Sequence, residues 1–371
     1  MELTTTAYGT WSGGRFMHFG ETLEEDRYLD CIRLAYESGV RTFVTADVYG
    51  QGKADEALGR ALADFPRDSY CLVGTIGHDF YEGTRNGSAG YPRFTDPSLR
   101  TAAEYRNFLR MACERSLQAC GTDHFDLLML HNPDELGYTN EAVWKGMDAL
   151  KEEGMTGMLG VAPGPANGFT LDLVKNFECF GEVIDWAMII LNPLEPWPGG
   201  LLLPAARDNG VKVLTRVVDY GGVFHDAIQP GHEFAPGDHR AYRPEGWVEN
   251  GCAKRELMRP LAEKYGLTMT QFASIWNLSQ EPVESVVPTF IQEPSEGAPA
   301  IEDQIKSYAK MPEVRLTAEE VESIRAIGDN TGCMPLKGAS KRHEMSERPD
   351  EWPMREDLLA VAEKYGLGDE W

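Results

Sequence analysis

Two side chains that can transfer protons, Tyr49 and His131, each follow an apolar run typical of a buried strand. Residues 42–62 begin with such a run, break at two glycines, and resume with apolar residues at helical spacing. This pattern predicts a strand, a loop and a helix, with Asp47 and Tyr49 in the loop. In a barrel of such units, the reacting side chains lie at the carboxyl ends of the strands. We therefore predict that Tyr49 and His131 are catalytic.

Further polar side chains lie at the ends of other predicted strands. His78 follows the third strand, Asn132 the fourth, and Arg216 and Asp219 lie at the end of the seventh. A buried arginine must be paired or must contact a ligand, so Arg216 forms either an internal ion pair or a grip for a substrate anion. The predicted substrate contacts are Trp11, Asp47, His78, Asn132, Arg216 and Asp219.

Each of these residues also has a simpler interpretation. Tyr49 and His131 could be packing residues at strand ends, and His78 could be a solvated loop histidine. Three further histidines recur every seven residues in a segment broken by two Pro-Gly pairs, which fits no compact ligand pattern. We therefore predict no metal site. A single cysteine near the end of the barrel, Cys333, cannot hold an iron–sulfur cluster.

Eight short apolar runs alternate with helical segments along the chain. Parallel strands need crossover helices, and closing the sheet into a barrel removes its edges. The fold class is therefore α/β, a single (β/α)8 TIM barrel over residues 1–335 with long loops at about 78–100 and 221–251. A C-terminal extension follows over residues 336–371 and includes a predicted helix at 355–365. Strands are expected near residues 70–77, 125–133, 157–162, 186–192, 211–218 and 283–289, after two shorter ones near the N-terminus.

The composition narrows the class of partner. The formal charge is 35 − 59 = −24, which argues against nucleic acid or an anionic membrane, because both require a basic surface. The chain has no signal-like start and no apolar run of the ~20 residues that span a bilayer. Its seven cysteines form no Cys-x-x-Cys pair and are expected to be reduced. We expect a cytoplasmic protein with a small-molecule substrate, and the oligomeric state stays open.

The motif around Tyr49 resembles the aldo-keto reductases. Their second strand usually reads Asp-Thr-Ala-Asp-x-Tyr-Gly, and this chain reads Val-Thr-Ala-Asp-Val-Tyr-Gly over residues 44–50. The resemblance continues in order over residues 9–328. It implies that Tyr49 gives a proton to a carbonyl oxygen, that His131 orients the substrate, and that nicotinamide gives a hydride. Val44 aligns with the family's aspartate, and Ile76 aligns with its lysine. Two apolar residues would therefore replace both members of an ion pair.

The residues expected to hold the nicotinamide also depart from the family. Its Gly-Val-Ser-Asn-Phe becomes Gly-Val-Ala-Pro-Gly over residues 160–164, its glutamine aligns with Met188, and its stacking aromatic aligns with Arg216. After the eighth strand, residues 288–296 carry carboxylates that would repel a 2′-phosphate. Asn192 and Thr289 are the expected cofactor contacts. NAD(P) is therefore implied by the resemblance alone, and the absence of any cofactor is the alternative.

Three functions remain open on these observations. The first is an oxidoreductase acting on a small carbonyl or hydroxyl compound, sugar-like or anionic. The second is a redox-neutral lyase, dehydratase or isomerase in which Tyr49 and His131 exchange protons. The third is a non-catalytic barrel that binds a ligand, since a fold alone does not establish a chemistry.

Overall fold

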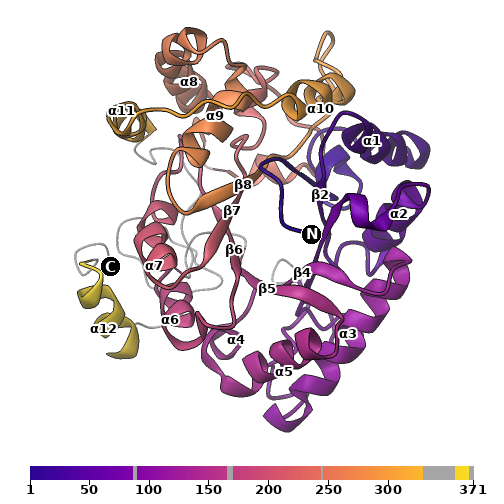
Figure 1. The fold of residues 1–371 in the computed structure, drawn as a ribbon. Helices are drawn as coiled ribbons and strands as arrows, with labels where there is room; N and C mark the ends of the chain where they lie inside the picture. Colours follow the sequence, from indigo (N-terminus) through magenta and orange to yellow (C-terminus); the bar gives the residue numbers. More distant parts are fainter. Residues whose placement is uncertain (87–89, 165–169, 244, 329–355, 367–371) are drawn as a thin grey trace.

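Eight parallel strands follow one another around a barrel in the computed structural model (Figure 1). The structure describes residues 1–371 except 87–89, 165–169, 244, 329–355 and 367–371. The strands are β1 Ala7–Gly9, β2 Thr42–Val44, β3 Cys71–Ile76, β4 Phe125–His131, β5 Thr156–Ala162, β6 Trp186–Ile190, β7 Lys212–Arg216 and β8 Val283–Val287. A parallel bridge from Thr6 to Val286 joins the first and last strands. The predicted (β/α)8 barrel is confirmed.

Helices cover the outside of the strands, as Figure 1 shows. Their bounds are α1 Glu25–Glu37, α2 Lys53–Leu62, α3 Tyr105–Cys120, α4 Glu135–Thr139, α5 Glu141–Glu152, α6 Thr170–Phe180, α7 Leu202–Asp208, α8 Trp247–Lys264, α9 Met269–Leu278, α10 Ile301–Ala309, α11 Ala318–Gly328 and α12 Glu356–Lys364. The sequence alone predicts helices near most of these positions, but none at α4 or α10. Its periodicity predicts a helix over residues 254–266, whereas α8 begins at Trp247, because the loop-like Gly251 lies inside that helix.

The core has two layers, which follow from the alternation of side chains along each strand. The interior of the barrel is lined by a small apolar cluster that includes Val44, Val73, Leu127, Met129 and Met188. A much larger cluster lies between the strands and the helices and includes Ile76. Only the first layer borders the carboxyl-end mouth where a site can form, so strand alternation decides which residues can take part in chemistry.

The C-terminal helix packs on the barrel. Helix α12, yellow in Figure 1, contacts α6, and Leu358, Val361 and Ala362 are buried. Lys364 forms an ion pair with Glu178 of α6. The prediction of a helix near the end of the extension is confirmed, whereas Cys333 lies outside the described residues.

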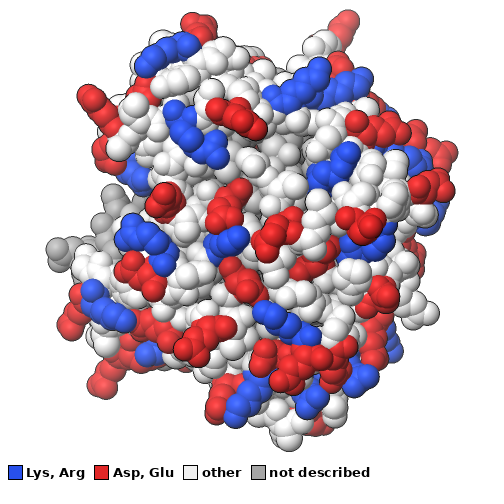
Figure 2. Space-filling view, in the orientation of Figure 1, with Lys and Arg blue, Asp and Glu red and all other residues white. Residues whose placement is uncertain are grey.

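The surface carries both signs of charge with acidic groups in excess. Figure 2 shows red carboxylates dispersed among fewer blue basic groups over one face, in keeping with the formal charge of −24. Among the described residues, no helix is long and apolar enough to cross a membrane. The six cysteines that the structure describes are all free thiols.

Candidate active site

Tyr49, His131 and Trp11 meet at the carboxyl-end mouth of the barrel. The ring centroids of Tyr49 and His131 are 5.8 Å apart with the rings nearly perpendicular. Trp11 lies edge-on to Tyr49 at 6.4 Å and donates from Nε1 to the Thr289 hydroxyl at 3.2 Å. Three different loops and strands thus bring a phenol, an imidazole and an indole together.

The loop between β2 and α2 positions Tyr49 by its backbone conformation. Gly50, Gln51 and Gly52 all have positive φ, at 62°, 57° and 90°. A Cβ atom at Gly50 would lie 2.8 Å from the Phe16 ring, so only glycine fits there. This stretch of positive-φ residues ends directly before Lys53, the first residue of α2. It holds Tyr49 at the mouth.

His131 is the last residue of β4, and it is buried and neutral. Burial lowers its pKa well below the usual range, and the charges of nearby Arg216 and Arg93 add to that shift, as does His78. Its Nδ1 atom is buried without a hydrogen-bond partner. A neutral imidazole can donate one hydrogen bond and accept another, so His131 can orient a substrate oxygen without itself carrying charge.

His78 forms a second histidine layer behind His131, with ring centroids 5.0 Å apart. Its Nδ1 lies 3.2 Å from Arg93 Nη1, and its Nε2 lies 3.0 Å from the side-chain amide of Asn132. The Arg93 guanidinium and the Asn132 amide nitrogen thus face the two ring nitrogens of His78. Burial, followed by the charge of Arg93, lowers the pKa of His78 to about 3.

Arg216 ends β7 and reaches across to β5. Its Nη2 donates to the backbone oxygens of Pro163 and Gly164, each at 2.8 Å. Its Nε is buried without an acceptor, and burial lowers the pKa of the guanidinium. The internal ion pair considered as one alternative does not form with any carboxylate of the described residues. Asp219 instead accepts from the backbone N–H groups of Thr289 and Gly222, at 2.7 and 2.8 Å.

Asp47 is buried, and within the described part of the chain its side chain forms no hydrogen bond with Tyr49 or His131. Burial raises its pKa well above the usual range, and nearby Asp55 raises it further, while the backbone of Val48 and the Tyr81 hydroxyl oppose the shift. Asp55, equally buried, accepts from Thr45 and Ser116 at 2.6 Å. The contacts of Asp47 therefore do not place it at the mouth with Tyr49 and His131. The prediction that Asp47 contacts the substrate gains no support from them.

The two apolar replacements lie on different sides of the barrel wall. Val44 is buried in the interior cluster, as predicted. Ile76 lies in the outer cluster between strand and helices, so the idea that it fills a lysine's place in the site is wrong. The inward residue beside it is Thr75, whose hydroxyl donates to the backbone oxygen of Thr45 at 3.1 Å. Strand alternation separates the two positions.

The residues expected to hold a nicotinamide offer it no free polar side chain. The Asn192 amide donates to Glu195 and to the Val217 carbonyl, and its oxygen accepts from two backbone N–H groups. The Thr289 hydroxyl already accepts from Trp11. At the end of β5, Ala162 has no polar side chain, and Met188 on β6 lies in the apolar interior. The two predicted cofactor contacts are thus engaged within the protein.

A buried ion cluster missed by the sequence analysis holds the long loop after β7 in place. Arg240 is 1% exposed and pairs with both Asp238 and Glu293. His232 lies 3.4 Å from Glu293, and Asp238 also accepts from the backbone N–H of Gly20 at 2.7 Å. Because Glu293 and Gly20 lie far in the sequence from Asp238 and Arg240, no local pattern indicated the cluster.

The regularly spaced histidines of this loop make separate contacts. His225 contacts the Thr289 carbonyl and the Thr270 hydroxyl, at 2.7 and 3.0 Å. His239 packs edge-on to His18, with ring centroids 5.3 Å apart. Within the described part of the chain, no group of three or more His, Cys, Asp or Glu side chains is arranged to hold a metal ion.

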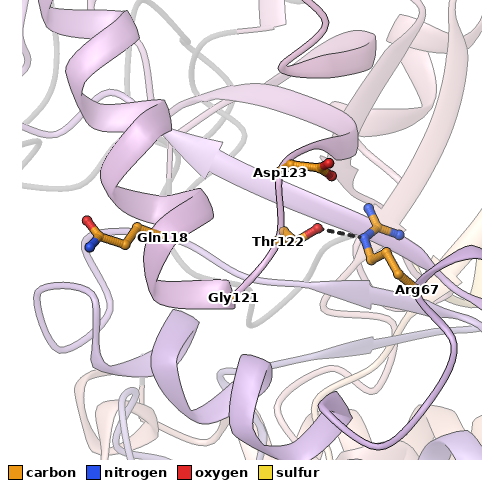
Figure 3. A pocket seen from close by; sticks show the side chains of 5 residues that line it. All are labelled: Arg67, Gln118, Gly121, Thr122 and Asp123. Atoms are coloured by element: carbon orange, nitrogen blue, oxygen red, sulfur yellow. Dashed lines mark hydrogen bonds between the residues drawn. The ribbon is translucent and has the colours of Figure 1, made fainter.

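A hollow of about 450 Å³ lies at the opposite, amino end of the strands. It is lined by Arg67, Gln118, Gly121, Thr122 and Asp123. Figure 3 shows these residues around the turn from α3 to β4, with Arg67 donating to the Thr122 hydroxyl at 3.0 Å. In barrels of this kind conservation at this end concerns stability rather than catalysis, and we assign it no chemistry.

Comparison with known proteins agrees with this architecture. The model of the aldo/keto reductase family matches residues 7–329. The aldo-keto reductase YhdN of Bacillus subtilis is 23% identical over 349 residues, which cover 91% of this chain and 93% of that protein. A probable voltage-gated potassium channel subunit beta of Arabidopsis thaliana is 22% identical, covering 77% of this chain and 83% of its own.

Two solved structures share the fold. The glycerol dehydrogenase AKR11B4 from Gluconobacter oxydans superposes with a TM-score of 0.69 at 24% identity, covering 88% of this chain and 92% of its own. An aldo/keto reductase from Klebsiella pneumoniae, solved in complex with NADP and acetate, has a TM-score of 0.59 at 16% identity, covering 90% of this chain and 94% of its own. At these identities the likeness concerns the fold.

Proposed function

The chain belongs to the aldo/keto reductase family, and we propose that it is an oxidoreductase acting on a small carbonyl or hydroxyl compound. The observation that carries this proposal is the pair formed by Tyr49 and His131, whose rings lie 5.8 Å apart at the barrel mouth. A phenol beside a neutral imidazole can bind one substrate oxygen from two directions. That is the arrangement that general acid catalysis on a carbonyl requires.

Tyr49 is the proposed proton donor. Burial raises its pKa, so the phenol is protonated at neutral pH, while the charge of Arg216 acts in the opposite direction. As the proton moves to the substrate oxygen, that positive charge stabilises the phenolate that forms.

His131 is proposed to hold the substrate oxygen in place. Because its pKa is far below neutrality, it acts as a neutral hydrogen-bonding group and does not compete with Tyr49 as an acid. Trp11 and Val44 border the same region with apolar surface. Restricting water around the reacting oxygen strengthens both hydrogen bonds.

The redox partner is proposed on family grounds as NAD(P). The structure of the Klebsiella relative contains NADP, but Asn192, Thr289 and Met188 provide no free side-chain contact for a nicotinamide here. Any nicotinamide that binds must therefore do so without the contacts that the resemblance predicted.

Titration with NADH and with NADPH, followed by nicotinamide fluorescence, tests this proposal. We expect saturable binding of at least one of the two. If neither binds at millimolar concentrations, the oxidoreductase proposal fails, and a redox-neutral enzyme that uses the same Tyr49 and His131 would have to replace it.

A further inference from the structure

We propose that Arg216 binds a carboxylate of the substrate, so that the protein acts on small oxo or hydroxy acids rather than on neutral carbonyl compounds. This inference rests on the proposed function and specifies its substrate class. It concerns a binding residue at the end of β7.

The position of the guanidinium places it beside the reacting groups. From the end of β7, Arg216 passes β6 and donates to the carbonyls of Pro163 and Gly164, which follow β5. Ala162, the last residue of β5, pairs in register with His131, and its oxygen accepts from Asn132 N at 2.6 Å. The guanidinium therefore reaches the end of the strand that adjoins His131, and its charge acts on both His131 and Tyr49.

The guanidinium lacks a formal counter-charge in the described part of the chain. Its two acceptors are neutral carbonyls, and its Nε has no acceptor. Glu195 is the carboxylate whose charge acts on it, and that side chain accepts from the Asn192 amide at 2.9 Å instead of pairing with Arg216. A largely buried cation without an anion is costly, unless a ligand supplies the anion.

The groups around it do not neutralise this charge. His131 and His78 both have pKa values lowered far enough to be neutral at neutral pH. Asp219 accepts from backbone N–H groups instead of pairing with Arg216, and burial raises the pKa of Asp47. Arg216 thus forms no ion pair with a carboxylate of the described residues. A ligand anion would supply that partner.

The chemistry of arginine favours a carboxylate as the partner. Its N–H groups form strong, charge-assisted hydrogen bonds with a carboxylate. Nη2 of Arg216 is already used on two carbonyls, which fixes the orientation of the guanidinium and leaves Nε and Nη1 as the donors for a ligand. A compact monoanion next to the reacting oxygen fits this geometry.

Binding of lactate and of lactamide, measured by calorimetry, tests the proposal, because the two compounds differ in charge but share the hydroxyl group. The variants are Arg216→Met, Arg216→Lys and, as a matched control, Arg207→Met on the surface of α7. We expect the wild type and Arg207→Met to bind lactate more tightly than lactamide. Arg216→Met should weaken lactate binding by ~10- to 100-fold while changing lactamide binding little. Arg216→Lys should retain part of the preference, and circular dichroism checks that each variant is folded.

Three results would overturn the proposal: equal losses for both compounds in Arg216→Met, no preference for lactate in the wild type, or tighter binding of inorganic phosphate than of lactate. Its failure can be told apart from that of the proposed function. Nicotinamide-dependent turnover without any preference for acids would refute only the carboxylate site. Arg216-dependent lactate binding without binding of NADH or NADPH would refute only the oxidoreductase.

Discussion

Removing the buried Arg240 is predicted to destabilise the fold strongly. Its guanidinium pairs with Asp238 and Glu293, donates to the Gly221 carbonyl at 3.1 Å, and is 1% exposed. In Arg240→Met, two buried carboxylates would lose their only cation partner among the described arginines and lysines. Breaking a buried pair in this way costs about 3–5 kcal/mol, and the burial leaves little solvent screening to reduce the figure.

The pH dependence of this loss has a definite sign. Burial opposes ionisation of Asp238, but the hydrogen bonds and the charge of Arg240 prevail and lower the pKa of Asp238. The ionised Asp238 therefore contributes stability at neutral pH, and this contribution is lost as pH falls through the lowered pKa. Without Arg240, burial is left to favour the protonated form of Asp238. The stability gap between the variant and the wild type should therefore shrink as pH falls toward about 4.

Equilibrium urea unfolding, followed by circular dichroism at neutral and at mildly acidic pH, measures both effects. Arg207→Met is the control, since the Arg207 side chain is 57% exposed and pairs with the adjacent Asp208. That control should change the free energy of unfolding by less than about 1 kcal/mol. An Arg240→Met variant within about 1 kcal/mol of the wild type at neutral pH would refute the reasoning.

Two further predictions concern the buried carboxyl of Asp55 and the contact between Gly9 and Trp11. Burial raises the pKa of Asp55 to about 6, above its unfolded value, so wild-type stability is partly lost as pH rises from about 4 to about 6. Asp55→Asn should remove that loss. In urea unfolding, the free energy of unfolding should fall less between the two pH values in the variant than in the wild type, and an equal fall in both would contradict this. A Cβ atom at Gly9 would lie 2.4 Å from the Trp11 ring, so Gly9→Ala must displace the indole beside Tyr49. We expect a higher KM in Gly9→Ala, and an unchanged KM would show that Trp11 does not shape the site.

The fold could be predicted from the sequence because each strand and helix leaves a local signal. Apolar runs of strand length, separated by helical periodicity, predicted the eight strands that the structure shows. The motif ending in Tyr49-Gly50 and the pair His131-Asn132 marked two strand ends. In a parallel barrel all strand ends of one kind lie on one face, and this is why residues distant in sequence could be expected to meet.

The directions of side chains could not be predicted in the same way. A one-residue shift along a strand moves a side chain to the other face, and this is how Ile76 was placed in the site although it packs outside. Asn192 looked available for a ligand because its bonds to Glu195 and the Val217 carbonyl leave no trace in the sequence. The cluster around Arg240 likewise depends on tertiary contacts alone.

The most direct test of the central claim compares Tyr49→Phe with Tyr8→Phe in turnover of a carbonyl substrate. The Tyr8 hydroxyl is buried without a hydrogen-bond partner and lies in the outer layer, so removing it serves as a matched control. If Tyr49 gives its proton to the substrate oxygen, Tyr49→Phe lowers kcat by ~10²-fold or more, while Tyr8→Phe turns over like the wild type. A Tyr49→Phe enzyme with the turnover of the wild type would contradict the account.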